Sequence, residues 1–311
     1  MERLFDSLDA STGDRPRHKA LGLTRRQLGI LAGMAGAAGV GLACTQAQIE
    51  DLLEQIRNRP MRRNIATMDP DDPVIASYAA AVEAMQALPN TDARSWTRQA
   101  EIHNDFCRHH NWLFLPWHRA YLYYFEQICR EMSGDDDFAL PYWNWTVDRQ
   151  VPAVFWDESS PLFHDNRTAT PTSQASDAQV GQATVDNALA TGNFILFAGE
   201  AVGLNHPPHF GPGMAPLESG PHNYIHNFVG GTMASFMSPL DPVFWLHHCR
   251  VDQLWVQWNL VEENPNTNDS DWTDTEFSEF SDRDGDPVTV RVAETTLYPL
   301  LSYRYDTQEV V

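Results

Sequence analysis

The sequence predicts a mainly helical fold built around a four-helix bundle, with a few short strands near the C-terminal end. Apolar residues recur at helical spacing in several segments, and proline and glycine mark where those segments begin and end. Most of the 12 histidines fall in two short windows, each carried by a pair of predicted helices. A bundle would turn those histidines toward one another from facing helices.

The predicted helices follow in order along the chain. The first spans 74–88, where apolar residues recur at helical spacing after Asp-Pro punctuation. Pro116 marks a break, and the run after it predicts a helix that stops at Gly134. A third helix is expected at 222–228. The fourth spans about 241–260 and begins on an Asp-Pro pair, in which Asp supplies the N-cap and Pro the first helical position.

The segments between and after these helices are less regular. Residues 157–192 are rich in Ser, Thr, Ala and Gln with little periodicity, which predicts a long surface loop or a partly ordered insertion. Residues 262–287 are acidic and turn-rich. Residues 288–305 alternate in places and predict one or two edge strands.

The first 47 residues have the composition of an export leader. Arg25 and Arg26 precede a Gly/Ala-rich apolar stretch at 28–43, which is short and weakly apolar for a membrane span. This arrangement resembles a twin-arginine (Tat) signal, the route of proteins that fold before export. We therefore expect a leader at 1–47, one folded domain at 48–311 and no stable membrane span. The location would be periplasmic or extracellular, with Cys44 as a candidate for lipid attachment.

Charge and cysteine content limit the partners and the chemistry. The 42 acidic residues outnumber the 21 Lys and Arg, and the net charge of -21 argues against nucleic acid and anionic lipid as partners. Outside the leader stand Cys107, Cys129 and Cys249, an odd number that cannot all pair within the chain. At least one of them is expected to have another role.

The histidine windows predict a metal site. His222 and His226 stand at i and i+4, so on a helix they share one face. His118 and His248 each lie on an apolar stripe that points into the core. Imidazole clusters without cysteine or carboxylate partners favour copper, whereas a hydrolytic zinc site would be expected to bring a carboxylate, a cysteine or an HExxH pattern.

The remaining histidines have a simpler interpretation. A lone histidine beside aromatic residues is more often a hydrogen-bonded core residue than a ligand. We expect that role for His164, His206 and His209.

Longer motifs surround the two windows. They are HHNWLFLPWHR at 109–119, PYWNW at 141–145, HNYIH at 222–226 and DPVFWLHH at 241–248, continuing with VDQLW at 251–255. These motifs resemble the copper-binding signatures of tyrosinases and polyphenol oxidases, which are type 3 copper proteins. The resemblance runs from about residue 62 to residue 305, and the chain is identified as a bacterial member of that family.

The resemblance implies two copper ions as cofactors. It assigns three ligands to copper A, namely His103, His109 and His118. It assigns three to copper B, namely His222, His226 and His248. His247 would then lie just outside the ligands, together with Asp252 and Glu126. These two acids could equally be caps or ion-pair partners.

Three further residues gain a role from the resemblance. Cys107 precedes His109 by two positions, as in fungal tyrosinases where such a cysteine forms a thioether to the histidine. Its alternative is a small buried core residue. Glu218 and Asn223 would hold a water near copper B, and that water would take the phenol proton. Glu218 could instead be a solvated loop acid.

The sequence departs from the family pattern after the second histidine pair. Cys249 and Arg250 replace a small residue and Asn, and an Arg there could favour acidic substrates or pair with an acid. The segment 303–305 resembles the tyrosine motif that closes the core domain, with Arg62 or Arg63 as its partner. Six residues follow it, so we expect no C-terminal shielding domain and an enzyme made in active form.

The implied activity is oxidation of small phenols by O2. Monophenols would be hydroxylated at the ortho position, and ortho-diphenols would be oxidised to ortho-quinones. The alternatives are a catechol oxidase or an ortho-aminophenol oxidase without monophenol activity. A rival of another class is an oxygen-binding protein of haemocyanin type. The oligomeric state is not predicted.

Overall fold

The computed structural model describes residues 54, 56–204, 206–298 and 301–307. Nearly all of them belong to one compact unit, Pro60–Asp306. A second unit combines Met1–Arg59 with Thr307–Val311. The predicted leader and Cys44 lie outside the described residues. Within the described part of the chain, no helix has both the length and the apolarity that a membrane span requires.

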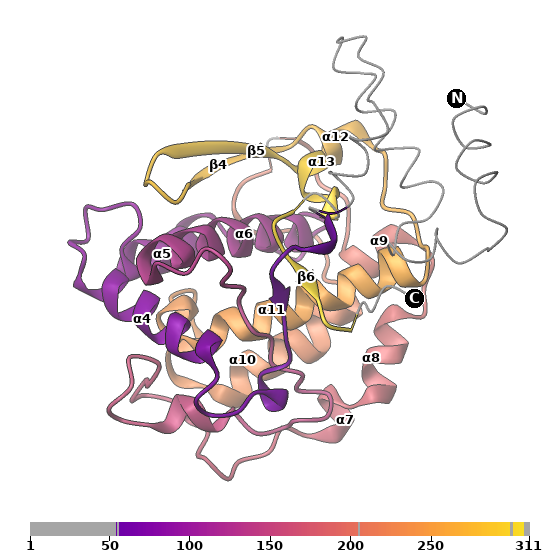
Figure 1. Ribbon diagram of the computed structural model, residues 1–311. Coiled ribbons are helices and arrows are strands. Elements are labelled where there is room, and N and C mark those ends of the chain that lie inside the picture. The colour runs from indigo at the N-terminus through magenta and orange to yellow at the C-terminus, as the bar shows by residue number, and fades with distance from the viewer. Residues whose placement is uncertain (1–53, 55, 205, 299–300, 308–311) are drawn as a thin grey trace, which may run out of the picture. The chain divides into compact units, whose positions relative to one another are not determined.

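Four helices form the centre of the unit, as the predicted bundle requires, but only three of them were predicted as helices; the helix at 96–106 was not, and the one predicted at 74–88 lies beside the four. The four are α5 (Trp96–Phe106), α6 (Phe114–Ser133), α10 (Asn223–Val229) and α11 (Val243–Val256), and α4 (Pro73–Ala87) packs against α6. Figure 1 shows α6 and α11 passing through the middle of this unit. Every residue of α11 is buried, so its side chains can only meet other protein groups or a bound ligand.

Local capping explains where the two central helices begin and end. Gly134 ends α6 in the left-handed conformation, with φ of 71°, as predicted. α11 begins at Val243, so that Pro242 and not Asp241 directly precedes the helix, one residue later than predicted. The Asp241 side chain still accepts a hydrogen bond from the Val243 backbone N–H and so satisfies one donor of the first turn. Asp241 is itself buried and paired with Arg167 at 2.6 Å. The helical path continues beyond α11 as a π-helical segment, Gln257–Val261, close to the predicted end.

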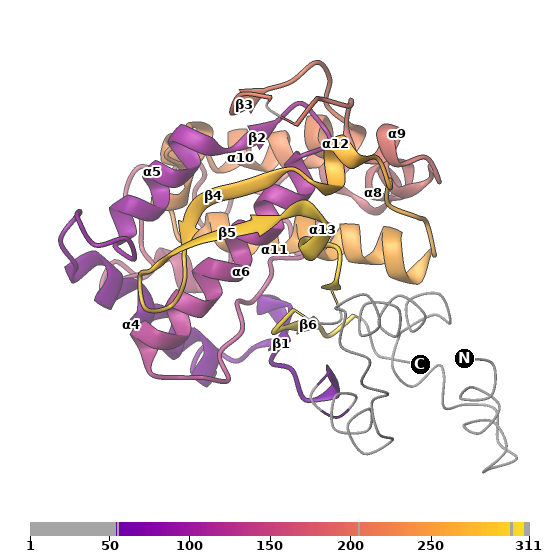
Figure 2. The ribbon, with the colours of Figure 1, turned by 90° about the horizontal axis from the view of Figure 1, so that it is seen from above.

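Strands are few and short, and they form three two-stranded sheets among the described residues. β1 (Met61–Arg62) pairs in parallel with β6 (Arg304–Tyr305), and β2 (Arg108–His109) pairs in parallel with β3 (His209–Phe210). β4 (Glu276–Ser281) and β5 (Pro287–Arg291) form an antiparallel hairpin, seen from above in Figure 2. The predicted strand region at 288–305 therefore contains β6 and most of β5.

Two segments are more ordered than their composition suggested. In place of a long loop, 157–192 contains α7 (Asp177–Val180) and α8 (Gln182–Leu189), because Val180, Val185 and Leu189 are buried in the core. The turn-rich segment 262–287 contains β4, whose Phe277 and Phe280 are buried beside α6. A few apolar residues among polar neighbours were sufficient to anchor both segments.

Smaller elements connect these parts. They are α9 (Phe194–Ala198), α12 (Ser270–Thr273), α13 (Val292–Thr295), a π-helical segment (Glu218–His222) and short 3-10 turns at Ile65–Thr67, Ala153–Trp156, Gly231–Ala234 and Ser238–Leu240.

Residues from both ends of the unit meet at one buried ionic network. Arg62 lies 2.8 Å from Glu126 and donates to the Tyr305 hydroxyl at 3.0 Å, and its guanidinium lies 3.4 Å from the centre of the Tyr303 ring. Arg63 instead pairs with Asp72 near the surface. Of the two arginines considered from the sequence, Arg62 is therefore the partner of the tyrosine motif.

Candidate metal centre

Three histidines from three elements form the first group. His103 comes from α5, His109 from β2 and His118 from α6. Their ring centres lie 5.1 to 5.6 Å apart. All three side chains are buried.

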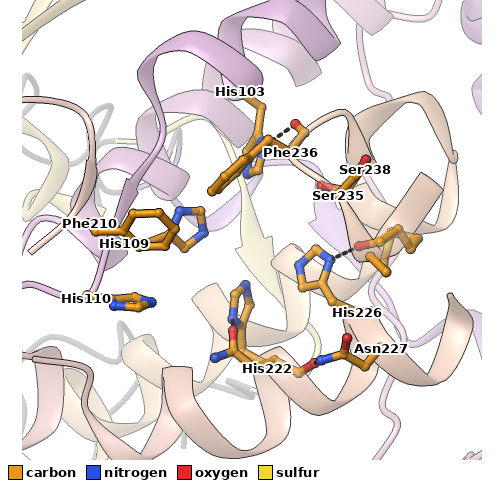
Figure 3. Close-up of a pocket in the computed structure, with 13 residues that line it drawn as sticks. His103, His109, His110, Phe210, His222, His226, Asn227, Ser235, Phe236 and Ser238 are labelled. Carbon is orange, nitrogen blue, oxygen red and sulfur yellow. Dashed lines mark hydrogen bonds between the residues drawn. The ribbon is translucent and has the colours of Figure 1, made fainter. Parts of the chain in front are cut away.

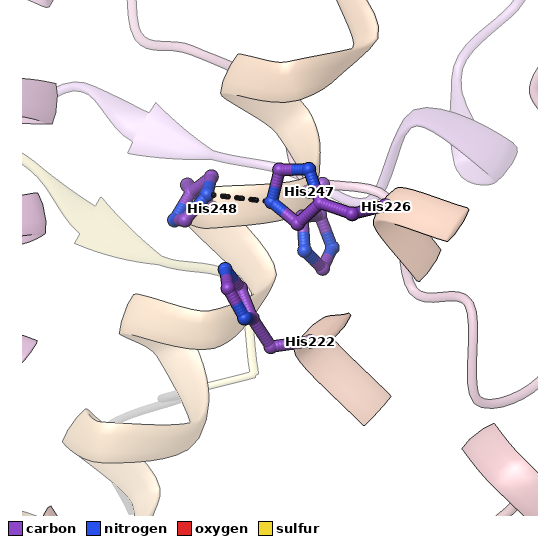
Figure 4. A group of neighbouring side chains, drawn as sticks. All are labelled: His222, His226, His247 and His248. Carbon is purple, nitrogen blue, oxygen red and sulfur yellow. Dashed lines mark hydrogen bonds between the residues drawn. The ribbon is translucent and has the colours of Figure 1, made fainter. Parts of the chain in front are cut away.

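The second group is drawn from the other two helices. His222 ends the π-helical segment Glu218–His222, His226 lies on α10 and His248 on α11. Pro221 lies inside the π-helical segment and lacks a backbone N–H, so the regular α-helical bonding is interrupted just before His222. The ring centres of this group lie 4.6 to 5.4 Å apart. Figure 4 shows the three rings gathered at one place with His247.

The two groups form one centre. His118 and His248 stack with ring centres 4.4 Å apart and planes 6° apart. His109 and His222 approach to 5.8 Å on another side. The structure therefore brings together all six histidines that the sequence analysis singled out as ligands.

Hydrogen bonds set the orientation of several rings. The Nδ1 atoms of His103, His118 and His226 lie 2.7 to 2.8 Å from the backbone carbonyls of Phe236, Phe114 and Met233. A carbonyl oxygen can only accept, so each Nδ1 carries the proton and each Nε2 keeps a lone pair. The lone-pair nitrogens of His103 and His118 then face each other at 3.5 Å, which a cation between them would stabilise.

The distances between nitrogens fit ligands that share an ion. Imidazole nitrogens about 2.0–2.1 Å from a tetrahedral ion lie about 3.3 Å from each other. The Nε2 atoms of His226 and His248 are 3.3 Å apart. In addition, His109 Nδ1, His222 Nε2 and His248 Nδ1 are buried without a hydrogen-bond partner among the described residues.

Burial also keeps these rings in the ligand form. It lowers the pKa of His103 to about 3 and that of His226 to about 4, and it lowers the pKa values of the other four well below the usual range. For every ring except His226, neighbouring imidazoles lower the pKa further. All six rings are therefore neutral at pH 7, as copper ligation requires, and this donor set of imidazoles fits copper.

His247 lies beside the second group of histidines. Its ring centre is 5.3 Å from that of His222, and its side chain is buried. Its nitrogen falls within the same 4.8 Å cluster as those of His222, His226 and His248. The structure thus places His247 in one cluster with the three expected ligands, and its role outside the ligand set stays a prediction.

Cys107 lies next to the first group. Its sulfur clusters with nitrogens of His103 and His109 within 4.8 Å, and it also lies 3.5 Å from His209 Nδ1. Cys107 is a free, buried thiol, and burial raises its pKa. The thioether to His109 therefore stays a prediction. The Cys107 sulfur lies close enough to the His109 ring for such a bond to be considered.

The three histidines expected in the core are only half-buried. His164 bonds to the Thr232 hydroxyl at 2.9 Å, and His206 bonds to the carbonyl of its neighbour Pro207. They are hydrogen-bonded as expected, but they lie at the surface of the packed unit. His209 contacts Cys107, a placement that depends on the β2–β3 pairing and has no local signal in the sequence.

Glu218 is buried beside the centre. Its side chain is 1% exposed and its Oε1 accepts a hydrogen bond from the His110 backbone N–H at 2.8 Å, so it is not a solvated loop acid. Burial raises the pKa of this carboxyl to about 8, although the hydrogen bond from His110 opposes that shift. Asn223 is half-buried, and its Oδ1 lies 3.0 Å from His222 Nδ1.

Asp252 on α11 and Glu126 on α6 are both held by buried arginines. Asp252 accepts hydrogen bonds from Arg119 and from the hydroxyls of Tyr303 and Tyr305. Glu126 pairs with Arg62 and Arg130. These contacts favour the ion-pair alternative for both acids.

Arg250 is 5% exposed and bonds to Gln253 and to the Thr146 hydroxyl. It does not line the pocket described next, which removes the reason to expect acidic substrates.

A pocket of about 250 Å³ opens onto the histidines. Four of the six histidines line it, and Figure 3 shows Phe236 next to His103 and Phe210 next to His109, with His222 and His226 across from them. The other lining residues are His110, Asn223, Asn227, Met233, Ala234, Ser235 and Ser238. The metal centre is thus buried but accessible to a ligand the size of a substituted ring.

Comparison with known proteins identifies the family. The common central domain of tyrosinase matches residues 79–209 and 208–261. The chain belongs to the tyrosinase family. Proteins of this family hold a dinuclear type 3 copper site, and the six histidines fit such a site.

Several relatives are similar over most of the chain. A chloroplastic polyphenol oxidase of Prunus armeniaca is 32% identical over 298 residues, covering 81% of this chain and 49% of its own length. A tyrosinase of Hahella sp. is 29% identical, covering 78% of this chain and 62% of its own. The chain spans about half the length of the plant relatives that it matches.

Solved structures share the fold. The crystal structure of a Vitis vinifera polyphenol oxidase aligns with a TM-score of 0.72 at 27% identity, covering 80% of this chain and 85% of that one. Latent apple tyrosinase aligns with a TM-score of 0.71 at 28% identity, covering 81% of this chain and 63% of that one. These neighbours are polyphenol oxidases with helical cores that hold the copper site, so the predicted fold class is confirmed.

Proposed function

We propose that this tyrosinase-family chain is a copper-dependent phenol oxidase. It would hydroxylate monophenols at the ortho position and oxidise ortho-diphenols to ortho-quinones with O2. The observation that carries the proposal is the facing pair of lone-pair nitrogens at His103 and His118, matched by the close pair at His226 and His248, beneath an accessible pocket. Related proteins named polyphenol oxidase and tyrosinase support it.

The six histidines would hold the two ions without acting as acids or bases. His103, His109 and His118 would bind copper A, and His222, His226 and His248 would bind copper B. When bound, the copper pair supplies the activation of dioxygen and accepts the electrons that leave the phenol. The backbone carbonyls behind His103, His118 and His226 hold those rings in the ligating orientation before any metal arrives.

Glu218 and Asn223 would manage the phenol proton through a water molecule. Asn223 lines the pocket and is bonded to His222, so it can present its amide beside copper B. Glu218 has one oxygen fixed by the His110 N–H, while its other oxygen has no partner among the described residues. A carboxyl with a pKa of about 8 is a stronger base than an ordinary Glu once it is ionised.

The pocket favours an enzyme over an oxygen carrier. A protein that only binds O2 needs no opening wide enough for an aromatic ring, whereas this pocket is lined by aromatic and amide side chains suited to one. We further propose that residues 1–47 are a Tat leader that is removed on export. N-terminal sequencing of the exported protein tests this, and an N-terminus that keeps Arg25 and Arg26 would contradict it.

Oxygen uptake by the copper-loaded protein tests the proposed activity. A tyrosine-like monophenol and a matching catechol are compared side by side. Uptake and quinone colour with both are expected. Uptake with the catechol alone would make the protein a catechol oxidase and would remove the role given to Glu218 and Asn223. Absence of uptake with both, followed by uptake with an ortho-aminophenol, would replace the proposal, and absence with all three would point to an oxygen carrier.

A further inference from the structure

Phe210 is an exposed aromatic residue at the edge of the pocket. It is 59% exposed, although it lines the same pocket as His109 and His222. Its ring meets His110 edge-on with centres 4.7 Å apart, and it lies 5.8 Å from Phe236. We call His110, Phe210 and Phe236 the aromatic rim. Figure 3 shows the three side chains on the His103–His109 side of the pocket.

The backbone holds the rim in place through pairing that is distant in sequence. Phe210 stands opposite His109 in the parallel β2–β3 ladder, and Gly211 N–H donates to the His109 carbonyl at 3.0 Å. A Cβ atom at Gly211 would lie 2.5 Å from the His110 carbonyl oxygen, so only glycine allows this approach.

Backbone strain is concentrated at the same place. His110 and His209 have φ of 58° and 72°, and they are two of the three non-glycine residues with positive φ in the described part of the chain. Such backbone conformations cost free energy and persist only where the surrounding structure enforces them. They are often found at ligand sites. The chain therefore maintains a strained arrangement whose visible result is an exposed ring at the pocket mouth.

The size and charge of the pocket indicate what would cover that ring. A cavity of ~150 Å³ is sufficient for a benzene-sized ligand, so about 250 Å³ leaves room beyond a single ring over the metals. None of the described residues that line it is Asp, Glu, Lys or Arg. A charged substituent would find no counter-ion there, and an anionic one would also meet the field of a chain with net charge -21.

We propose that the aromatic rim is a binding subsite for the second ring of uncharged two-ring phenols, with Phe210 as its specificity-determining residue. This inference rests on the proposed function, because it presumes that the first ring lies over the histidines. The second ring would meet Phe210 and Phe236 in the offset or edge-on geometry that aromatic pairs prefer. Burying the exposed face of Phe210 under the ligand adds to the affinity.

The test compares 4-benzylcatechol with 4-methylcatechol, which differ by the second ring. Phe210→Ala and the milder Phe210→Leu are compared with Leu196→Ala, a control that removes another side chain that is 62% exposed and does not line the pocket. Dissociation constants are measured by calorimetry on protein loaded with copper(I), without dioxygen, so that the metal cannot oxidise the catechol, and KM values are measured in air.

Wild-type protein is expected to favour the benzyl compound, and Phe210→Ala is expected to reduce that preference roughly tenfold in the ratio of dissociation constants. Phe210→Leu should lie between, and Leu196→Ala should leave the ratio as it is. An unchanged ratio in Phe210→Ala, or equal weakening of both compounds, would overturn the subsite. Because calorimetry needs no turnover, a protein that binds with this preference but oxidises neither compound would refute the proposed activity and leave the subsite supported.

Discussion

At the scale of single residues, Glu218 shows how burial changes the chemistry of a group beside the metal centre. Its carboxyl is 1% exposed, and burial raises its pKa to about 8 from the ordinary value of 4.5. A carboxyl whose folded pKa is raised contributes stability that is fully present below its unfolded pKa, where both states are protonated. Between the two pKa values the folded protein keeps a proton that the unfolded chain has lost, so stability falls as the pH rises. That contribution is lost as the pH rises from about 4.5 to about 8.

Glu218→Gln should therefore remove a pH dependence. As the pH rises from 5 to 8, the free energy of unfolding of metal-free wild-type protein is expected to fall relative to that of the variant. The expected difference is on the order of a few kcal/mol. Urea unfolding of both proteins across this range measures the difference. Parallel curves for the two proteins would contradict the raised pKa. The comparison with Gln also cancels the separate titration of the histidines.

Individual ligands were predictable from the sequence because their neighbours share a local pattern. His222 and His226 stand one helical turn apart, and His118 and His248 lie on apolar stripes. Phe210 and Phe236 had no such signal. Phe210 reaches the pocket because its strand pairs with a segment about 100 residues earlier in the chain. Phe236 reaches it from an irregular turn.

At the scale of elements, the start of α11 depends on a buried ion pair. Asp241 accepts a hydrogen bond from the first turn of the helix and is held by Arg167, with both side chains at most 1% exposed. Removing the arginine leaves a buried carboxylate without its counter-ion, which is far more costly than losing an exposed pair.

Arg167→Ala is accordingly expected to lower the free energy of unfolding by about 3–5 kcal/mol. The matched control is Arg149→Ala, whose partner Asp177 has a side chain 77% exposed, and a loss below about 1 kcal/mol is expected there. Chemical denaturation measures both variants. Equal losses in the two variants would show that the Arg167–Asp241 pair does not anchor α11.

The predicted elements differ from the observed ones where a segment is mostly polar and only a few of its apolar residues are buried. Helix α8 has only Val185, Ala188 and Leu189 buried, and β4 has Phe277 and Phe280 between polar residues. Their partners lie in distant parts of the chain, so composition alone indicated loops. Helices α6, α10 and α11 were predictable because prolines, a glycine and apolar periodicity agreed with one another, whereas α5, which carries His103, was not predicted.

At the scale of the whole Pro60–Asp306 unit, Arg62 connects the beginning of the unit to its end. It is fully buried and contacts Glu126 of α6, the Tyr305 hydroxyl of β6 and the face of Tyr303. Asp252 of α11 joins the same network through both tyrosine hydroxyls. The network therefore ties the helices that carry His118 and His248 to the strand that closes the unit.

Arg62→Ala should destabilise this unit by up to about 3–5 kcal/mol, because Glu126 and Asp252 would each lose one of two buried arginine partners and keep only Arg130 and Arg119, respectively. Arg63→Ala provides the control, since Arg63 is 35% exposed and pairs with Asp72 near the surface, and a change below about 1 kcal/mol is expected. Thermal unfolding followed by circular dichroism compares them. A larger effect in Arg63→Ala than in Arg62→Ala would contradict the role given to the network.

The central claim is that six histidines from four helical regions and one short strand hold two copper ions in one centre. The most direct measurement is the copper content of metal-loaded, desalted protein, compared with that of His118→Ala, His248→Ala and the control His164→Ala, whose ring lies outside the centre. We predict two copper ions per chain in the wild type and the control, about one in each ligand variant, and no dioxygen uptake by His248→Ala despite an unchanged circular dichroism spectrum. Two copper ions and full dioxygen uptake in His248→Ala would contradict the account.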